Sequence, residues 1–272
     1  MEYILLLVVL FVLPGFTSLD FKTLVLLLLF CLTDKLVPMG EIIEFSSNAN
    51  TVQGYLAIPQ DKSPKESPGV LVIQEWWGLV DHIKDVCDRF AQEGFVALAP
   101  DLYHGTTVSE PDEAAKEMMA LKLDETARDL SGAVDELHSR SGSQGVGVIG
   151  FCMGGGLALV LSCQRPDLVS AVIPCYGIIP WPEAQPDYSL MSASVQGHFG
   201  EFDDFFTPEA ALALGEQLRS LGKECEIVIH PGTNHAFFND ARPEVFNRVE
   251  ADKLWKASLA FFREKLIVPE RN

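Results

Sequence analysis

Hydrophobic residues from position 39 onward follow alternating strand and helix patterns. The run at 69–73 is apolar throughout, as a parallel strand buried on both faces requires. Segments 41–45 and 52–58 alternate between polar and apolar residues, which predicts an opening hairpin. Further strands are expected at 95–99, 144–149, 168–175, 194–199 and 224–230, and helices at 81–93, 113–139 (one or two), 153–164, from 207 onward and at 244–266. This order predicts one α/β domain, with a doubly wound, mostly parallel sheet and helices on both faces.

Residues 1–38 differ in composition from the rest of the chain. They contain two leucine-rich runs, 3–13 and 24–32, each shorter than the roughly 20 apolar residues that a spanning helix needs. Three explanations stay open. Translation could start at Met39, which would give a cytoplasmic protein; the segment could target or anchor the chain, which would then be membrane-associated or exported; or it could be an ordered part of the fold. We therefore divide the chain into a hydrophobic segment, 1–38, and a single domain, 39–272.

The charge balance limits the classes of partner. The 272 residues include 38 acidic and 20 basic side chains, which gives a formal net charge of −18. Because nucleic-acid binding requires clustered Lys and Arg, this partner class is excluded. The six cysteines show neither a Cys-x-x-Cys pair nor a histidine spacing typical of zinc sites, so we expect reduced thiols and no metal.

The segment Gly150-Phe151-Cys152-Met153-Gly154 joins a predicted strand to a predicted helix. Glycine two residues before and two after the central residue is typical of a nucleophile elbow, because a Cβ at either place would collide with the neighbouring strand or helix. The helix N-terminus would favour a thiolate at Cys152. A buried structural cysteine beside a glycine-rich turn is the alternative.

A thiol nucleophile needs a base and a group that orients the base. In open α/β sheets these groups lie at the carboxyl ends of strands. Asp203 follows the strand at 194–199, and His235 follows the strand at 224–230. The chain order Cys152, Asp203, His235 is the order in which α/β-hydrolases present their triad. Asp204 remains an alternative to Asp203 as the acid.

Glu75 follows the apolar run at 69–73 and is expected to hold the Cys152 thiol through a hydrogen bond; a capping or solvated role is the alternative. The backbone N–H groups of Trp76 and Met153 are predicted to form an oxyanion hole. Trp77 belongs either to the core or to the pocket wall.

Other residues near strand ends could line the substrate pocket. These candidates are Trp77, Tyr103, His104 and Phe237. The remaining histidines have structural explanations: His82 and His138 are expected at helix surfaces, His198 within a strand and His230 at a strand end.

Together these residues resemble the dienelactone hydrolase family, also called carboxymethylenebutenolidases, of the α/β-hydrolase fold. The resemblance extends from Met39 to about residue 266. It rests on five motifs in order: Gln-Glu-Trp-Trp-Gly at 74–78, Ala-Pro-Asp-Leu-Tyr at 99–103, Gly-Phe-Cys-Met-Gly-Gly at 150–155, Gly-Glu-Phe-Asp-Asp at 200–204 and Asn-His-Ala-Phe at 234–237.

The resemblance implies a role for each site residue. Cys152 matches the nucleophile, Asp203 the triad acid, His235 the base and Glu75 the glutamate that gates the thiol. The reaction implied is thiolate attack on an ester or lactone carbonyl, followed by hydrolysis of the thioester. No metal or organic cofactor is implied, the substrate is a small molecule, and the oligomeric state is left open.

One departure from the family pattern concerns substrate charge. Family members that act on dienelactone hold its carboxylate with arginines, one of them a few residues after the catalytic histidine. Here 236–240 contains no arginine, and the region 109–127 has Lys116 and Lys122 instead. Arg242 could substitute only if its loop bends differently. A neutral lactone or an activated ester is therefore expected.

Two functions of other classes remain as alternatives. The domain could bind a small ligand without catalysis, although such a protein needs no Cys, Asp and His at these strand ends. The chain could also be a membrane-tethered interaction protein that works through residues 1–38. A chain that begins at Met39 and keeps full activity would make the second alternative unnecessary.

Overall fold

The structure is a computed structural model that describes residues 39–47, 50–179 and 185–269. The chain divides into two compact units, 1–38 and 39–272. The expectations for 1–38 fall outside the described residues. In the part of the chain that is described, no helix is long and apolar enough to cross a membrane.

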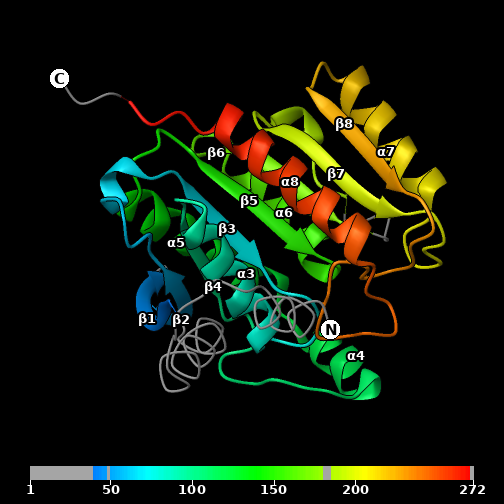
Figure 1. The fold of residues 1–272 in the computed structure, drawn as a ribbon, viewed down its shortest axis with the longest axis horizontal. Helices are drawn as coiled ribbons and strands as arrows, with labels where there is room; N and C mark the ends of the chain where they lie inside the picture. The colour runs from blue at the N-terminus through cyan, green and yellow to red at the C-terminus, as the bar shows by residue number, and fades with distance from the viewer. Residues whose placement is uncertain (1–38, 48–49, 180–184, 270–272) are drawn as a thin grey trace, which may run out of the picture. The chain divides into compact units, whose positions relative to one another are not determined.

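The domain is built on one eight-stranded sheet with the order β1-β2-β4-β3-β5-β6-β7-β8 (Figure 1). The first two strands form the expected antiparallel hairpin, and β2 also runs antiparallel to β4, whereas all later neighbours are parallel. The strands are β1 (Gly40–Ser47), β2 (Asn50–Ala57), β3 (Gly69–Ile73), β4 (Val96–Pro100), β5 (Val146–Phe151), β6 (Val169–Cys175), β7 (Ser194–Gly200) and β8 (Cys225–His230). The predicted mostly parallel sheet is confirmed.

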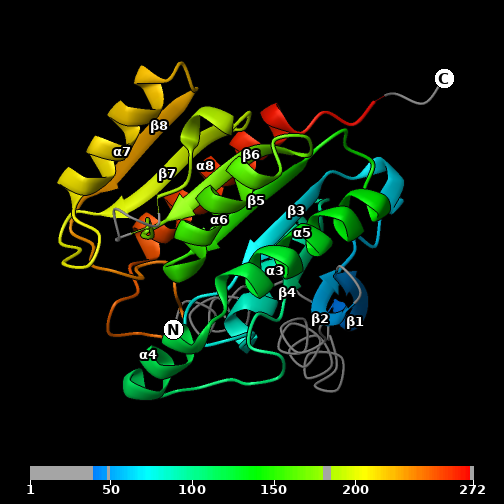
Figure 2. The same ribbon diagram turned by 180° about the vertical axis from the view of Figure 1, so that it is seen from behind.

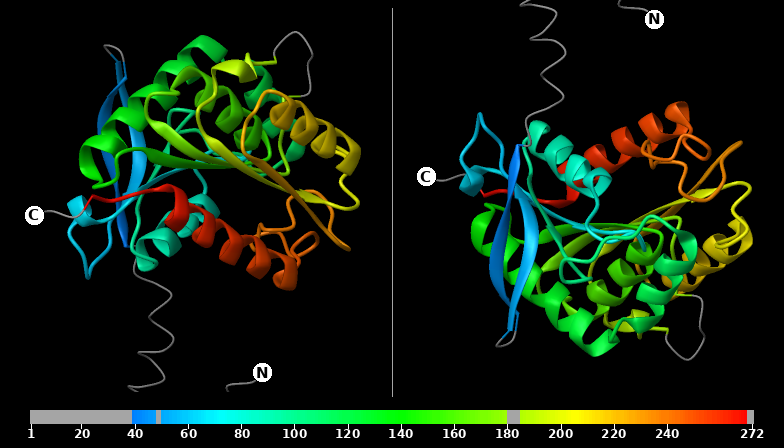
Figure 3. Two further views of the ribbon diagram at one scale, coloured as in Figure 1. Left: turned by 90° about the horizontal axis from the view of Figure 1, so that it is seen from above. Right: turned by 90° about the horizontal axis from the view of Figure 1, so that it is seen from below.

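Helices cover both faces of this sheet. The helices are α3 (Asp81–Gln92), α4 (Pro111–Ala120), α5 (Leu123–Arg140), α6 (Met153–Gln164), α7 (Pro208–Ser220) and α8 (Arg248–Lys265), with short 3-10 turns at Pro64–Glu66 and Tyr188–Leu190. Apolar side chains of α3 and α8 pack on one face, and those of α5, α6 and α7 on the other. Figures 2 and 3 show these two layers from behind and with the sheet seen nearly edge-on.

The central strand β3 is an unbroken apolar run because helices cover both of its faces. All five of its residues are buried. Leu71 and Ile73 join the core beneath α5 and α6, while Val70 and Val72 join the core beneath α3 and α8. Successive side chains of a strand point to opposite faces, so a strand covered on both sides has no polar face.

The helix boundaries follow local capping. Thr207 accepts a hydrogen bond from the Ala210 amide at 3.3 Å, with Pro208 in the first turn, as expected for the start of α7. The closing helix starts at Arg248 rather than at 244, because the Asn247 side chain caps it by accepting from the Glu250 amide. The region 113–139 contains two helices, α4 and α5.

His82 corrects one expectation. Its position on α3 predicted a surface side chain, but only 6% of the residue is exposed. Its Nδ1 lies 3.1 Å from Oδ1 of Asp240, in the segment after β8. The amphipathic helix turns His82 toward the core, where this carboxylate satisfies one ring nitrogen.

Candidate active site

Cys152 lies in a sharp turn between β5 and α6. Its φ of 54° is in the left-handed region, which a residue with a side chain adopts at a cost in free energy. A Cβ at Gly150 would overlap the Gly154 carbonyl, and a Cβ at Gly154 would overlap the carbonyls of Ile73 and Gln74. These overlaps are the ones that the elbow geometry predicted. The turn leaves the Cys152 side chain partly exposed at the N-terminus of α6.

Asp203 and His235 meet where the segments after β7 and β8 come together. Nδ1 of His235 lies 2.8 Å from Oδ2 of Asp203, whose side chain is completely buried. The other oxygen, Oδ1, accepts hydrogen bonds from the backbone amides of Phe205 and Phe206 at 2.8 and 2.9 Å. Asp204 is exposed. The carboxylate that contacts the imidazole is therefore that of Asp203.

The thiol of Cys152 lies close enough to the imidazole of His235 to affect its pKa. Burial favours the neutral ring and lowers its pKa, but the hydrogen bond to Asp203 and the nearby Cys152 thiol outweigh burial and raise the pKa to about 10. A ring that holds its proton at neutral pH can stabilise a thiolate and can later protonate a leaving group. Asp203 and His235 thus form a hydrogen-bonded pair, and the Cys152 thiol lies close to the imidazole.

Glu75 is 1% exposed and therefore lies in the protein interior. Its Oε2 accepts a hydrogen bond from Nδ2 of Asn239 at 2.6 Å, and its Oε1 accepts one from the Tyr176 hydroxyl at 3.4 Å. The Tyr176 ring also packs edge-on against His235, with 5.3 Å between centroids. Glu75 is thereby connected to the triad through Tyr176. Its predicted gating of the Cys152 thiol stays a prediction.

The backbone N–H groups predicted for an oxyanion hole are those of Trp76 and Met153. Met153 is the first residue of α6, where an N–H has no partner within its helix. Trp76 lies in the turn after β3. The part of these two N–H groups in an oxyanion hole stays a prediction.

The predicted pocket residues differ in their surroundings. Trp77 is 8% exposed and packs edge-on against Trp76, with 5.1 Å between ring centroids. The Tyr103 hydroxyl donates to Sδ of Met153 at 3.7 Å, which places Tyr103 beside the elbow. Phe237 is completely buried in the core, 4.7 Å from the ring of His230. Their role in a pocket stays a prediction.

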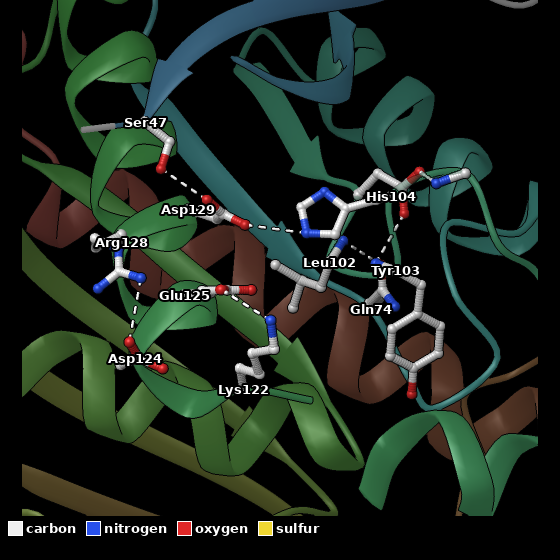
Figure 4. Close-up of polar contacts among 12 residues, drawn as sticks. Ser47, Gln74, Leu102, Tyr103, His104, Lys122, Asp124, Glu125, Arg128 and Asp129 are labelled. Atoms are coloured by element: carbon white, nitrogen blue, oxygen red, sulfur yellow. Dashed lines mark hydrogen bonds and ion pairs between the residues drawn. The ribbon is translucent and has the colours of Figure 1, made fainter. Parts of the chain in front are cut away.

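His104 lies beside α5, and its contacts are with Asp129 rather than with the triad (Figure 4). Nε2 of His104 is 3.5 Å from Oδ2 of Asp129, and the other oxygen of Asp129 accepts a hydrogen bond from Ser47 at 2.7 Å. The turn that carries His104 is fixed by Asp101, whose Oδ1 accepts from the Tyr103 amide at 3.1 Å. The cluster links β1, α5 and the segment after β4, which is a structural role.

A buried chain of polar groups lies under the triad segments and was not predicted. Nδ1 of His198 is 2.9 Å from Nε2 of His230, and Nδ1 of His230 is 2.9 Å from Oε2 of Glu250. Lys253 donates to the other oxygen of Glu250 at 2.7 Å. The chain joins β7, β8 and α8. A histidine in each of two predicted strands could have indicated a buried polar contact. The sequence alone does not show that these two strands are neighbours in the sheet.

Two further residues that sequence reasoning missed are Phe205 and Phe206. Their ring centroids lie 5.1 and 5.9 Å from that of His235. Among the described residues, no group of three or more potential metal ligands is found. The chemistry that this site can support is nucleophilic attack by a thiol assisted by an imidazole.

Comparison with known proteins agrees with this arrangement. The model of the Dienelactone hydrolase family matches residues 52–266. The chain is 35% identical over 237 residues to "Protein usf" of Aquifex pyrophilus and 32% identical over 237 residues to "Putative carboxymethylenebutenolidase" of Aquifex aeolicus, covering 84% of this chain and 100% of each relative.

A solved structure is similar to the same family. The crystal structure of "Putative Dienelactone Hydrolase" from Klebsiella pneumoniae superposes with a TM-score of 0.75 at 26% identity, covering 83% of this chain and 98% of that chain. The eight-stranded sheet, the elbow and the match over 52–266 lead to one conclusion: the chain belongs to the dienelactone hydrolase family of ester- and lactone-hydrolysing enzymes and has the α/β-hydrolase fold.

Proposed function

We propose that this hydrolase cleaves small lactones or esters with Cys152 as the nucleophile, His235 as the proton carrier and Asp203 as the residue that orients His235. The observation that carries the proposal is the His235 imidazole, which is hydrogen-bonded to the buried Asp203 carboxylate and lies close to the elbow thiol. A structural cysteine would need neither the strained elbow nor the imidazole.

The proposed reaction follows from the charges of the Cys152, His235 and Asp203 side chains. The Cys152 thiolate attacks the carbonyl carbon, a C–S bond forms and the carbonyl oxygen becomes an oxyanion. The oxyanion collapses, the C–O bond breaks, and His235 gives its proton to the leaving oxygen. Water, deprotonated by His235, then hydrolyses the thioester and regenerates the thiol. Asp203 keeps Nδ1 of His235 protonated, so that Nε2 faces the reacting atoms.

The developing oxyanion is stabilised by the N–H groups of Trp76 and Met153. Both N–H groups come from the backbone, so no side chain has to be ordered when the oxyanion forms. Glu75 acts before the reaction. In our proposal, its carboxylate accepts a hydrogen bond from the Cys152 thiol until substrate displaces that bond.

The site favours an uncharged substrate. The position four residues after His235 is Asn239, whose amide is already bound to Glu75. The guanidinium of Arg242 lies 5.1 Å above the Trp77 ring and forms an ion pair with Glu244 at 2.7 Å. Because its charge is balanced by Glu244, Arg242 is a weak partner for a substrate carboxylate. Neutral lactones are expected to react faster than carboxylated lactones of the same ring.

Hydrolysis of p-nitrophenyl esters and small lactones tests the proposal. Cys152→Ala should lower kcat/KM at least about a thousandfold, because the nucleophile is removed while the fold is kept. Cys225→Ala, which removes another partly exposed thiol, is the control and should retain activity. Equal activity of wild type and Cys152→Ala would rule out the thiol mechanism.

The same assay addresses the alternatives. A chain that begins at Met39 should keep full activity if residues 1–38 have no part in the reaction. Absence of hydrolysis in the wild type, together with binding of the same lactones, would favour the small-ligand-binding protein.

A further inference from the structure

Phe205 is an exposed aromatic residue next to the triad. Its side chain is 73% exposed, although a phenyl ring is normally buried. It contacts His235 through a tilted ring pair with 5.1 Å between centroids, and Phe206 approaches the same imidazole at 5.9 Å. An apolar surface that flanks a reactive group is typical of a ligand site.

The backbone that carries the two rings is held by the carboxylate that orients His235. Oδ1 of Asp203 accepts hydrogen bonds from the backbone amides of Phe205 and Phe206, and Oδ2 contacts Nδ1 of His235. One buried carboxylate therefore sets the positions of the imidazole and of both aromatic residues. The backbone of the two residues cannot move away from His235 without loss of hydrogen bonds to the carboxylate that orients the base, so both side chains start next to the imidazole.

The charge around these rings is negative. Glu201 and Asp204 flank the segment and are exposed. The Glu201 carboxylate accepts a hydrogen bond from the Gly232 amide at 2.7 Å, which holds this charge close to the turn that precedes His235. A substrate group placed against Phe205 is therefore uncharged or positive rather than anionic, and an aryl or alkyl group fits the apolar ring faces.

The chemistry of the proposed reaction says which part of the substrate lies here. His235 gives its proton to the leaving oxygen as the C–O bond breaks. The leaving oxygen must therefore come within hydrogen-bond distance of the His235 ring, and the carbon group attached to that oxygen must extend past it. Of the rings that flank His235, that of Tyr176 is completely buried. Phe205 is exposed and Phe206 is partly exposed, so a substrate group can reach these two rings.

We propose that Phe205 and Phe206 form the subsite for the leaving alcohol, and that this subsite takes an uncharged aryl or apolar alkyl group. The inference rests on the proposed function and deepens it, because it names the side of the substrate that the enzyme selects. The acyl group bound to Cys152 lies outside this subsite. Phe205 is a specificity residue and takes no part in proton transfer.

A series of esters with one acyl group tests this subsite in the full chain. Acetates of 2-naphthol and benzyl alcohol share their acyl-enzyme with 2-methoxyethyl acetate, so differences in kcat/KM among them report the leaving group alone. Phe205→Ala should lower kcat/KM about tenfold for the aryl and benzyl acetates and less than about twofold for 2-methoxyethyl acetate. Phe205→Leu, which keeps an apolar side chain, should lower kcat/KM for the aryl and benzyl acetates less than Phe205→Ala does.

Two controls separate the subsite from general effects. Phe202→Ala removes another exposed phenyl group from the same segment and should leave the ratio between benzyl and methoxyethyl acetates unchanged. Phe205→Ala should also leave the ratio between phenyl acetate and phenyl butyrate unchanged, since the acyl side is not contacted.

Equal losses for all three acetates would mean that Phe205 only positions His235, and would overturn the subsite. The same conclusion would follow if Phe205→Ala changed the oligomeric state without changing the ester ratios. Binding of 2-naphthol, followed by its fluorescence, provides a readout that does not need turnover. Weaker binding to Phe205→Ala supports the subsite and equal binding overturns it, even if Cys152→Ala shows that the thiol mechanism itself is wrong.

Discussion

Asp203 connects the reactive groups at the scale of single residues. Its carboxylate binds the imidazole of His235 through one oxygen and two backbone amides through the other. A charged acceptor in a buried position forms stronger hydrogen bonds than a neutral one. The two amides hold the carboxylate at a fixed angle, so His235 is oriented with little freedom before substrate binds.

Asp203→Asn should therefore lower kcat/KM by about a hundredfold to ten-thousandfold, because an amide can donate to Nδ1 and select the wrong tautomer. The matched control is Asp204→Asn, which removes the same charge from the neighbouring exposed position and should change kcat/KM less than about threefold. Ester hydrolysis by both variants decides between the two acids. A larger effect at Asp204 would contradict the assignment.

The elbow is the decisive arrangement at the scale of elements. β5 passes into α6 through one residue, Cys152, with a positive φ, and the helix starts so close to the end of β3 that a Cβ at Gly154 would overlap the carbonyls of Ile73 and Gln74. The close approach brings the N-terminus of α6 to the carboxyl ends of β3 and β5.

Gly154→Ala should destabilise the domain by about 1–3 kcal/mol or more, because the added Cβ overlaps backbone atoms, which cannot rotate away as a side chain can. Activity should fall with stability. Val160→Ala, at a partly exposed position of α6, should change the free energy of unfolding by less than about 1 kcal/mol. Urea unfolding measures both variants, and similar free energies would show that the elbow tolerates a side chain at 154.

Stability at the scale of the whole molecule depends on buried histidines. Burial and the neighbouring His230 lower the pKa of His198 from 6.5 to about 3, so the ring is neutral in the folded protein. In the unfolded chain the same ring takes up a proton near its ordinary pKa. Between pH 6.5 and 3 the unfolded state therefore binds more protons, and the stabilisation present above pH 6.5 is lost as the pH falls.

The free energy of unfolding should fall by about 1.4 kcal/mol per pH unit through His198 alone as the pH drops below 6.5. His198→Gln should reduce this slope, since an amide does not titrate. Urea unfolding at pH 7, 6 and 5 measures the slope of the unfolding free energy against pH. His138→Gln, at a half-buried position of α5, is the control and should keep the wild-type slope of the unfolding free energy against pH. Equal slopes for wild type and His198→Gln would show that other groups dominate acid unfolding.

The sequence predicted those features that depend on local chemistry. Apolar runs such as 69–73, the start of α7 at Thr207 and Pro208, and Gly150 before Cys152 each act within a few residues, so their effect can be read from the local sequence. The order of strands and helices led to the α/β-hydrolase fold, and the five motifs led to the dienelactone hydrolase family.

Only the tertiary structure decided which distant groups meet. Asp203 and Asp204 have equivalent sequence positions, and the distance to His235 separates them. His82 was expected at the surface because a helix position does not reveal which face packs inward.

The contacts of Phe205 with His235, and of His198 with His230, join the segments of two strands that are neighbours only in the folded sheet. Local patterns follow from backbone sterics and periodicity, whereas contacts between separate segments depend on strand order and register. A single sequence determines the first directly and the second only through the fold.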